Sequence, residues 1–204
     1  MPPNHHGATI TQQATEHVPV EGPVVDHAIS VAVSIVEQAI GFLDILGTDE
    51  RLTYPSQAIP GGTIGKHIRH VADHYNLLLK AVVEGKLNDL SYDTRSRNTP
   101  VETSISRARE ELLGLIDRLK NVVPTVPLDE PVTLHAVTPF PAVMQTTFGR
   151  ELWFTSLHAI HHWSMIRVIA AEQGIASDDP FGVAPSTLES RKGSEGQDLM
   201  KSKI

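Results

Sequence analysis

Four long segments of this chain repeat apolar residues at the spacing of an α-helix, and no other feature constrains the fold as strongly. The first segment carries an apolar stripe formed by Ile29, Val33, Val36, Ile40 and Leu43. It lies between Pro23 and Gly47. Proline is favoured in the first turn of a helix and glycine commonly follows the last, so these two residues mark the predicted limits.

The other three segments carry signals of their own for where a helix begins and ends. The second starts near Thr63 and runs to Gly85, and the fourth starts at Thr146 or Thr147 and ends at Gly174. In the third, Thr99 is the predicted N-cap, with Pro100 as the first helical residue and Glu102 as the partner that completes a capping box.

A short stretch between the third and fourth helices has a different pattern. Val132, Leu134 and Ala136 alternate with polar residues, and Thr138-Pro139-Phe140-Pro141 supplies a turn before Ala142–Gln145. This pattern predicts a β-hairpin. The fold expected from the whole chain is all-α, a four-helix bundle over residues 21–188 with one long crossover and this hairpin. The polar tails at 1–20 and 189–204 are expected to be disordered.

Charge and composition exclude several classes of protein. Seventeen Lys and Arg stand against 24 Asp and Glu, a formal net charge of -7, which argues against a nucleic-acid partner held through phosphates. The chain has no cysteine, so it has no disulfide, zinc ribbon or thiol nucleophile of its own.

Targeting signals are not evident either. Residues 1–20 show no apolar run after a basic start, as a secretory leader would. The apolar stretch Ala28–Ile45 is interrupted by polar residues such as Ser34 and Glu37, which is unsuited to a membrane span. We therefore expect a cytoplasmic protein with no membrane partner.

Histidine is the unusual residue, with 11 in 204 positions. Two clusters hold six of them: His67, His70 and His74 in the second helix, and His158, His161 and His162 in the fourth. On a helical wheel His158 and His162 are about 40° apart and face the apolar side, whereas His161 lies about 60° to one side of His158.

Two imidazoles one helical turn apart can hold a transition metal when a third from a facing helix completes the site. Bundles build such sites in their cores. The alternative is that the histidines are structural and are satisfied by buried partners or water. The presence of two inward-facing clusters favours a metal.

The histidine segments also resemble a known family. Gly65…His70-x-x-x-His74 and Arg150-Glu151-Leu152…His158-x-x-His161-His162 are similar to the DinB superfamily of metal-binding bundles. Tyr92-Asp93-x-Arg95-x-Arg97 with Glu102, and Phe181-Gly182-Val183-Ala184-Pro185-Ser186-Thr187, resemble one subgroup of small DinB-like proteins. The resemblance covers residues 25–190.

This resemblance implies an up-down-down-up bundle, often a homodimer, that holds zinc, nickel or iron on three histidines. Matched residue by residue, the ligands are His70, His158 and His162. His74 and His67 lie one turn on either side of His70, and His74 is the alternative ligand. His161 is assigned a supporting or structural role.

The family includes thiol S-transferases and a thiol-dependent maleylpyruvate isomerase. The resemblance therefore implies a metal-dependent transferase or isomerase that uses a low-molecular-weight thiol on a small-molecule substrate. A metal with an open position can bind a thiol and lower its pKa. Two other functions stay open, a metal-binding stress-response protein without turnover and a dimeric structural bundle.

The loop between the second and third helices supplies the candidate substrate-binding residues Tyr92, Arg95 and Arg97, because a guanidinium group can clamp a carboxylate. The alternative is that the arginines form ion pairs which tie the loop to the bundle. Glu151 either orients a metal-binding histidine or pairs with one of these arginines.

Overall fold

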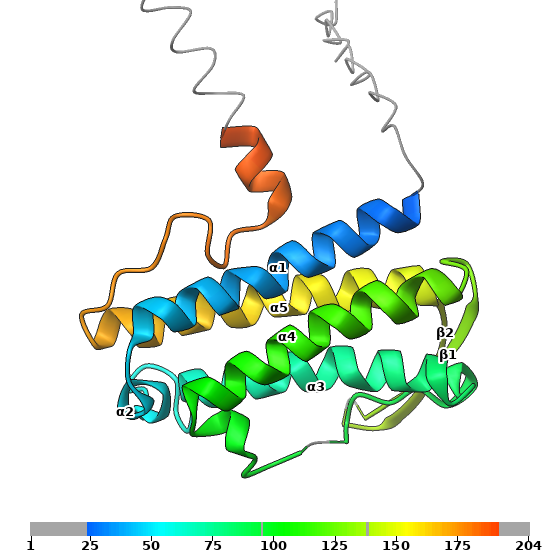
Figure 1. Cartoon of the computed structure of the whole chain (residues 1–204). Coiled ribbons are helices and arrows are strands. Elements are labelled where there is room, and N and C mark those ends of the chain that lie inside the picture. Colours follow the sequence, from blue (N-terminus) through cyan, green and yellow to red (C-terminus); the bar gives the residue numbers. More distant parts are fainter. Residues whose placement is uncertain (1–23, 95, 138, 192–204) are drawn as a thin grey trace, which may run out of the picture.

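Four long helices dominate the computed structural model, which describes residues 24–94, 96–137 and 139–191 (Figure 1). They are α1 (Val24–Leu46), α3 (Ile64–Val83), α4 (Ile105–Val122) and α5 (Phe148–Glu172). A short helix, α2 (Asp49–Thr53), which the sequence pattern did not predict, links α1 to α3. Three 3-10 turns lie in the connections between the helices: η1 (Leu87–Asp89), η2 (Pro100–Glu102) and η3 (Val123–Thr125).

The helices form the predicted all-α bundle with up-down-down-up topology. In Figure 1, α3 and α4 run in one direction, and α1 and α5 run in the other. α1 and α3 each contact both α4 and α5. Because α3 and α4 are parallel, the chain between them must travel the length of the bundle, and this crossover occupies residues 84–104.

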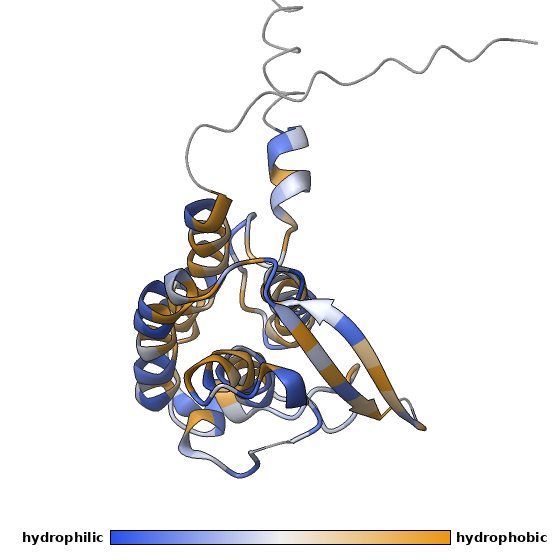
Figure 2. Ribbon diagram, turned by 90° about the vertical axis from the view of Figure 1, so that its right-hand side faces the viewer, coloured by the Kyte–Doolittle hydropathy of each residue, from blue (hydrophilic) through white to orange (hydrophobic). Residues whose placement is uncertain are grey.

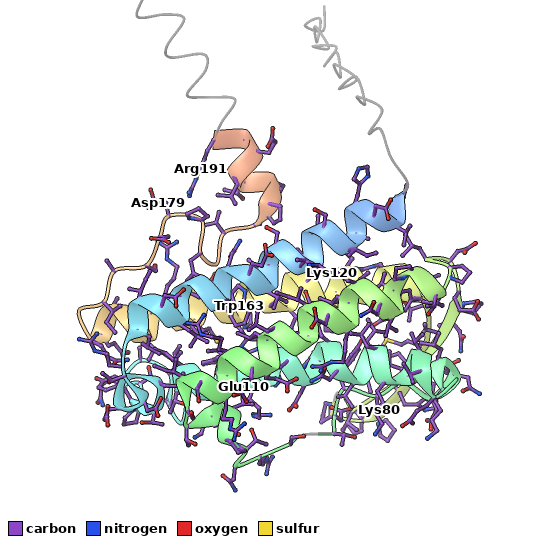
Figure 3. All side chains as sticks on the ribbon, in the orientation of Figure 1. Lys80, Glu110, Lys120, Trp163, Asp179 and Arg191 are labelled. Carbon is purple, nitrogen blue, oxygen red and sulfur yellow. The ribbon has the colours of Figure 1, made fainter. Side chains whose placement is uncertain are left out.

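The core lies between the four helices, where the apolar faces turn inward (Figure 2). At its centre Trp163 of α5 is fully buried and donates its indole N–H to the carbonyl oxygen of Ile35 in α1 at 2.9 Å (Figure 3). Tyr75 of α3, also buried, donates its hydroxyl to Ser156 Oγ at 3.0 Å. These two bonds satisfy the polar ends of large aromatic side chains and fix α5 against both α1 and α3.

Within the part of the chain that the structure describes, α1 is the one helix long and apolar enough to cross a membrane. Its Ala32, Val36 and Leu46 side chains are fully buried in the bundle. The core helix of a bundle meets the same criteria of length and composition.

The helices that carry the histidines begin where the sequence predicted. Thr63 Oγ1 accepts the backbone N–H of Lys66 at 3.1 Å and caps α3, and Thr147 Oγ1 accepts that of Arg150 at 3.3 Å and caps α5. These caps satisfy N–H groups that the first turn leaves unpaired.

The predicted capping box at Thr99 is wrong. Residues Pro100–Glu102 form η2, α4 begins only at Ile105, and the Thr99 side chain makes no cap hydrogen bond. The Glu102 carboxylate instead accepts the backbone N–H of Asn98 at 3.1 Å and pairs with Arg69 of α3 at 2.9 Å. The ion pair with α3 holds Glu102 away from the helix start.

The predicted hairpin is present as β1 (Pro131–Val137) and β2 (Pro141–Thr147), paired antiparallel from Pro131↔Thr147 to Val137↔Pro141. The crossover pairs with the edge of β1 that faces away from β2. Leu90 N–H donates to Thr133 O at 3.1 Å, and His135 N–H donates to Leu90 O at 2.8 Å. This pairing carries the residues after Leu90 toward the start of α5.

After α5 the chain folds back over the bundle. Phe181 stacks on Phe42 of α1 with ring centroids 4.7 Å apart. Residues 185–191 are helical, so the predicted boundary at 189 falls inside a helical segment. The remainder of the two predicted tails, 1–20 and 192–204, lies outside the described residues, as does Pro23.

Candidate metal centre

Five histidines from two facing helices meet at one place in the bundle. α3 contributes His67, His70 and His74, and α5 contributes His158 and His162. Their spacing of three and four residues along each helix puts them on one face, as the sequence predicted. The helix caps at Thr63 and Thr147 fix where each of the two helices begins.

His158 lies at the centre of the predicted ligand set. Its Nε2 atom is 3.0 Å from His70 Nε2 and 3.2 Å from His162 Nε2. Two nitrogens that bind one metal at about 2.1 Å lie about 3.0 Å apart at a right angle and about 3.4 Å apart at the tetrahedral angle. The observed separations therefore fit neighbouring ligands of one ion.

Hydrogen bonding alone does not explain this arrangement. A neutral imidazole nitrogen carries either one hydrogen or one lone pair. His158 Nε2 can therefore make one ordinary hydrogen bond, yet two other ring nitrogens approach it. A cation that accepts all three lone pairs accounts for both contacts.

His74 gives a second way to complete a set of three. Ring nitrogens of His70, His74 and His158 all lie within 4.8 Å of one another. The Nδ1 atom of His74 is 2.9 Å from the carbonyl oxygen of His70. Because a carbonyl only accepts, Nδ1 carries the hydrogen and Nε2 keeps a lone pair, as in a metal ligand.

The two possible sets share His70 and His158. Each neutral imidazole offers a single lone pair, so His70 and His158 cannot bind two ions at once. The cluster therefore suits one metal ion, with His70 and His158 common to both sets and His162 and His74 beside them.

The remaining two histidines lie at the edge of the cluster. His67 Nδ1 is 2.7 Å from His162 Nδ1. His161 is exposed, and its ring centroid is 6.1 Å from that of His158. His161 therefore lies outside the short nitrogen contacts, and its supporting or structural role stays a prediction.

The cluster strongly disfavours protonated imidazole. Burial, together with neighbouring histidines, lowers the pKa of His158 to about 4 and that of His162 to about 2. Burial, with smaller contributions from His161 and Arg69, lowers the pKa of His67 to about 4. The three rings are thus neutral near pH 7, which is the state that binds a metal.

A pocket of about 440 Å³ adjoins the histidines. Its wall includes Tyr92 and Asp93 from the crossover, Leu134, Val137 and Met144 from the hairpin, and Arg150, Glu151 and Phe154 from α5. Two of these rings face the histidines. Tyr92 stacks on His74, and the Phe154 ring centroid is 5.5 Å from that of His158.

Tyr92 is tied to the buried Glu151 side chain. Its hydroxyl donates to Glu151 Oε2 at 3.1 Å. Glu151 was expected to orient a histidine or to pair with a loop arginine; the structure instead shows it holding Tyr92, whose ring lies against His74. Burial and the nearby Glu151 carboxylate raise the pKa of Tyr92 far above its usual range, so its hydroxyl stays protonated.

The loop arginines do not all reach this pocket. Arg97 is exposed and lines a different cavity, with Lys66, Arg69, Asn98 and Glu102. Arg95 lies outside the described residues. The cation on the wall of the pocket is Arg150, whose guanidinium makes no ion pair with any described residue.

Arg150 and Phe154 line this pocket, although the sequence pattern did not predict either as a pocket residue. A signal for both was available, because Phe154 lies one turn before His158 and Arg150 lies one turn before Phe154 on α5. Residues spaced by four share a helix face.

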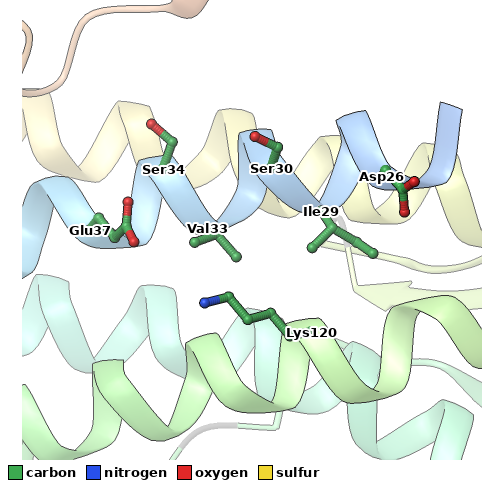
Figure 4. Close-up of a pocket in the computed structure, with 7 residues that line it drawn as sticks. All are labelled: Asp26, Ile29, Ser30, Val33, Ser34, Glu37 and Lys120. Atoms are coloured by element: carbon green, nitrogen blue, oxygen red, sulfur yellow. The ribbon is translucent and has the colours of Figure 1, made fainter. Parts of the chain in front are cut away.

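A groove between α1 and α4 has no link to this chemistry. Asp26, Ile29, Ser30, Val33, Ser34 and Glu37 of α1 line it together with Lys120 of α4 (Figure 4). None of the residues that line it is a histidine. The histidine cluster is therefore the stronger candidate for a functional site.

Comparison with known proteins agrees with the fold. A curated protein of Rhizopus delemar, "FK506-binding protein 5", is 29% identical over 165 residues, which make up 79% of this chain and 37% of that protein. The chain thus spans little more than a third of that relative. The crystal structure of a DinB-like protein from Bacillus subtilis matches with a TM-score of 0.52 and 13% identity, over 76% of this chain and 97% of the other. The sequence profile of the DinB superfamily matches residues 37–166. This chain belongs to the DinB superfamily.

Proposed function

We propose that this protein holds one divalent metal ion on His70, His158 and His162 and uses it in a transferase or isomerase reaction with a small thiol. The observation that carries the proposal is the position of His158 Nε2, 3.0 Å from His70 Nε2 and 3.2 Å from His162 Nε2. Membership of a metal-binding superfamily supports it.

The metal is proposed to be zinc, nickel or iron, since imidazole suits all three. When bound, such an ion supplies Lewis-acid chemistry and lowers the pKa of a coordinated thiol or water. The chain has no cysteine, so the thiol in this proposal arrives as a cosubstrate.

The pocket beside the histidines suits a small substrate with an apolar body and a negative charge. Leu134, Met144 and Phe154 provide the apolar wall. Arg150 provides, at the start of α5, a guanidinium group that has no ion-pair partner among the described residues. A guanidinium group binds a carboxylate through two parallel hydrogen bonds. Either the substrate or the thiol can supply that carboxylate.

The first experiment is elemental analysis by plasma mass spectrometry of the untagged full chain with His5, His6 and His17 replaced by alanine. These substitutions remove N-terminal histidines that could bind nickel outside the proposed site. One equivalent of zinc, nickel or iron per chain is expected, before or after dialysis against each ion. A content near zero under every condition would contradict the proposal and favour a structural bundle.

A second experiment separates an enzyme from a metal-binding protein without turnover. The metal-loaded protein is incubated with a series of low-molecular-weight thiols and with electrophiles that do or do not carry a carboxylate. Thiol consumption that depends on protein and metal is expected. One bound metal without any thiol consumption would favour the non-catalytic stress-response function.

We also propose that the protein is a homodimer formed through the outer face of α5. Trp153, Leu157 and Val168 are each between 41% and 44% exposed and are spaced by four and eleven residues, so they form one apolar stripe. Sedimentation velocity of the wild type and of Leu157→Glu tests this. A wild type that sediments as a monomer at every concentration would contradict it.

A further inference from the structure

We propose that His67 is a positioning residue for the metal ligand His162. In this arrangement, the Nδ1 atom of His67 accepts the Nδ1–H of His162, so that His162 turns the lone pair of Nε2 toward His70 and His158. The inference rests on the proposed function, because it concerns one ligand of the proposed metal site.

The contact that carries the inference is the short one between the two Nδ1 atoms. They are 2.7 Å apart, closer than the 3.0 and 3.2 Å separations within the predicted ligand set. His67 lies on α3 and His162 on α5, so the contact joins the two helices that build the site.

The position of one proton decides whether His162 can bind a metal. If His162 carries its hydrogen on Nδ1, it donates to His67 and its Nε2 atom has a free lone pair. If His67 carries the hydrogen on Nδ1 instead, the hydrogen of His162 sits on Nε2 and points at His158. Only the first arrangement lets His162 bind a metal, so His67 acts as the acceptor when His162 is a ligand.

The Nε2 side of the His67 ring is buried against the loop before α3. In the proposed arrangement Nε2 carries the hydrogen, and this atom has no hydrogen-bond partner among the described residues. Gly62 packs against that side, because a Cβ atom at this position would lie 3.3 Å from His67 Nε2 and 2.9 Å from Ile59 Cγ2. A glycine therefore lets the loop before α3 close over the back of the imidazole.

That loop is itself fixed to α5. The Glu172 carboxylate, at the C-terminal end of α5, accepts the Ser56 hydroxyl at 3.0 Å and the backbone N–H of Gln57 and Ala58 at 3.0 and 2.8 Å. Gly62 O accepts the backbone N–H of Ser56 at 3.0 Å. His67 is thus clamped between a rigid loop and His162.

Metal-binding histidines usually donate their second ring N–H to a carboxylate, a carbonyl or water, and loss of that partner typically costs 10- to 100-fold in metal affinity. His74 has such a partner in the carbonyl oxygen of His70. For His162 the partner is a neutral imidazole, which orients the ligand without adding negative charge beside the ion.

The test compares two substitutions of nearly equal size. Both are made in the full chain in which His5, His6 and His17 are replaced by alanine. In His67→Asn, the side-chain oxygen replaces Nδ1 as an acceptor, whereas in His67→Leu no acceptor is present. The zinc affinity of each is measured by chelator competition, and the Co²⁺ absorption spectrum reports the ligand field. Thermal unfolding of the metal-free variants checks that both fold.

We expect His67→Leu to lose about 10- to 100-fold in zinc affinity and to alter the Co²⁺ spectrum. His67→Asn should retain most of the affinity and the wild-type spectrum. If both variants bind as the wild type does, or if both lose affinity equally, His67 is not the acceptor and the inference is overturned. If the wild type itself binds no metal, it is the proposed function that fails.

Discussion

The phenol ring of Tyr92 lies parallel to the imidazole of His74, with centroids 5.1 Å apart and planes 8° from parallel. Its hydroxyl reaches past the histidine to Glu151 Oε2 at 3.1 Å. One residue of the crossover therefore links α3 to α5 at the edge of the histidine cluster and closes the adjoining pocket on that side.

We predict that Tyr92→Phe lowers the free energy of unfolding by about 1 to 3 kcal/mol, because it leaves a buried carboxylate without the hydroxyl that donates to it. Glu151 is 5% exposed. Urea denaturation measures the change. The matched control is Tyr54→Phe, whose hydroxyl makes no hydrogen bond with a described residue. Equal effects of the two substitutions would show that the Glu151 bond is not responsible.

Replacing His158 by alanine should abolish metal binding, since His158 belongs to both possible ligand sets. Isothermal titration with zinc and circular dichroism of the metal-free variant provide the measurements, and helical content should be kept. His135→Ala, in the hairpin, and His161→Ala, on the exposed side of α5, serve as controls that keep the metal. Metal retention by His158→Ala would refute the site, and loss by His161→Ala would mean that the ligands are misassigned.

The stability of the metal-free protein should fall as the pH is lowered from about 6.5 toward 4. Burial holds the pKa of His67 and His158 near 4 and that of His162 near 2, below the ordinary value of 6.5. The unfolded chain therefore takes up protons in this range that the folded chain does not, and the stabilisation present above pH 6.5 is lost. Urea unfolding at pH 7.5, 6 and 5 tests this. The double variant His158→Ala, His162→Ala should show a shallower dependence, and an equally steep one would contradict the assignment.

Gly65→Ala should destabilise the protein by about 1 to 3 kcal/mol, the usual cost of an added methyl group in a packed site. A Cβ atom at Gly65 of α3 would overlap the carbonyl oxygen of Glu102 in η2. The control is Gly41→Ala in α1, where a Cβ atom meets nothing within 4 Å. That change should stabilise the helix by about 0.5 to 1 kcal/mol, because alanine is the better helix former. Opposite signs in thermal unfolding are the expected result.

Arg150→Met should raise the KM for a carboxylate-bearing substrate, once one is found by the thiol screen, and should leave KM for an uncharged analogue unchanged. Arg97→Met is the control, since Arg97 does not line the pocket beside the histidines. Steady-state kinetics of the two variants decide the matter. An equal rise in KM for both analogues would mean that Arg150 does not bind the carboxylate.

Most of the fold could be predicted from the sequence because helix caps, helix stops and apolar stripes are local features of the chain. Threonine caps and glycine stops fix α3 and α5, and the apolar stripes fix which faces meet, so the histidines of both helices lie together as expected. The capping box at Thr99 failed because a distant residue, Arg69, recruits Glu102. An ion pair between two residues 33 positions apart cannot be predicted from a local sequence pattern.

The pocket was harder to predict than the histidine cluster. Which residues line it depends on the path of the crossover, and that path is set by the pairing of Leu90 with Thr133 and His135 in the hairpin. For this reason Tyr92 reaches the site and Arg97, five residues later, does not. Spacing alone leaves open which of His67, His70 and His74 is the ligand from α3. In the structure His74 and His162 both lie beside the His70–His158 pair.

The candidate metal site joins residues that are far apart in the chain, since His70 and His158 are separated by 88 in residue number. A chain emerging from the ribosome presents α3 long before α5, and with it histidines on one helix only. If the proposed site is correct, metal loading would wait until α5 has been synthesised and has packed against α3. The proposed ion would then be selected by the geometry of the folded bundle and not by whichever cation the nascent chain meets first.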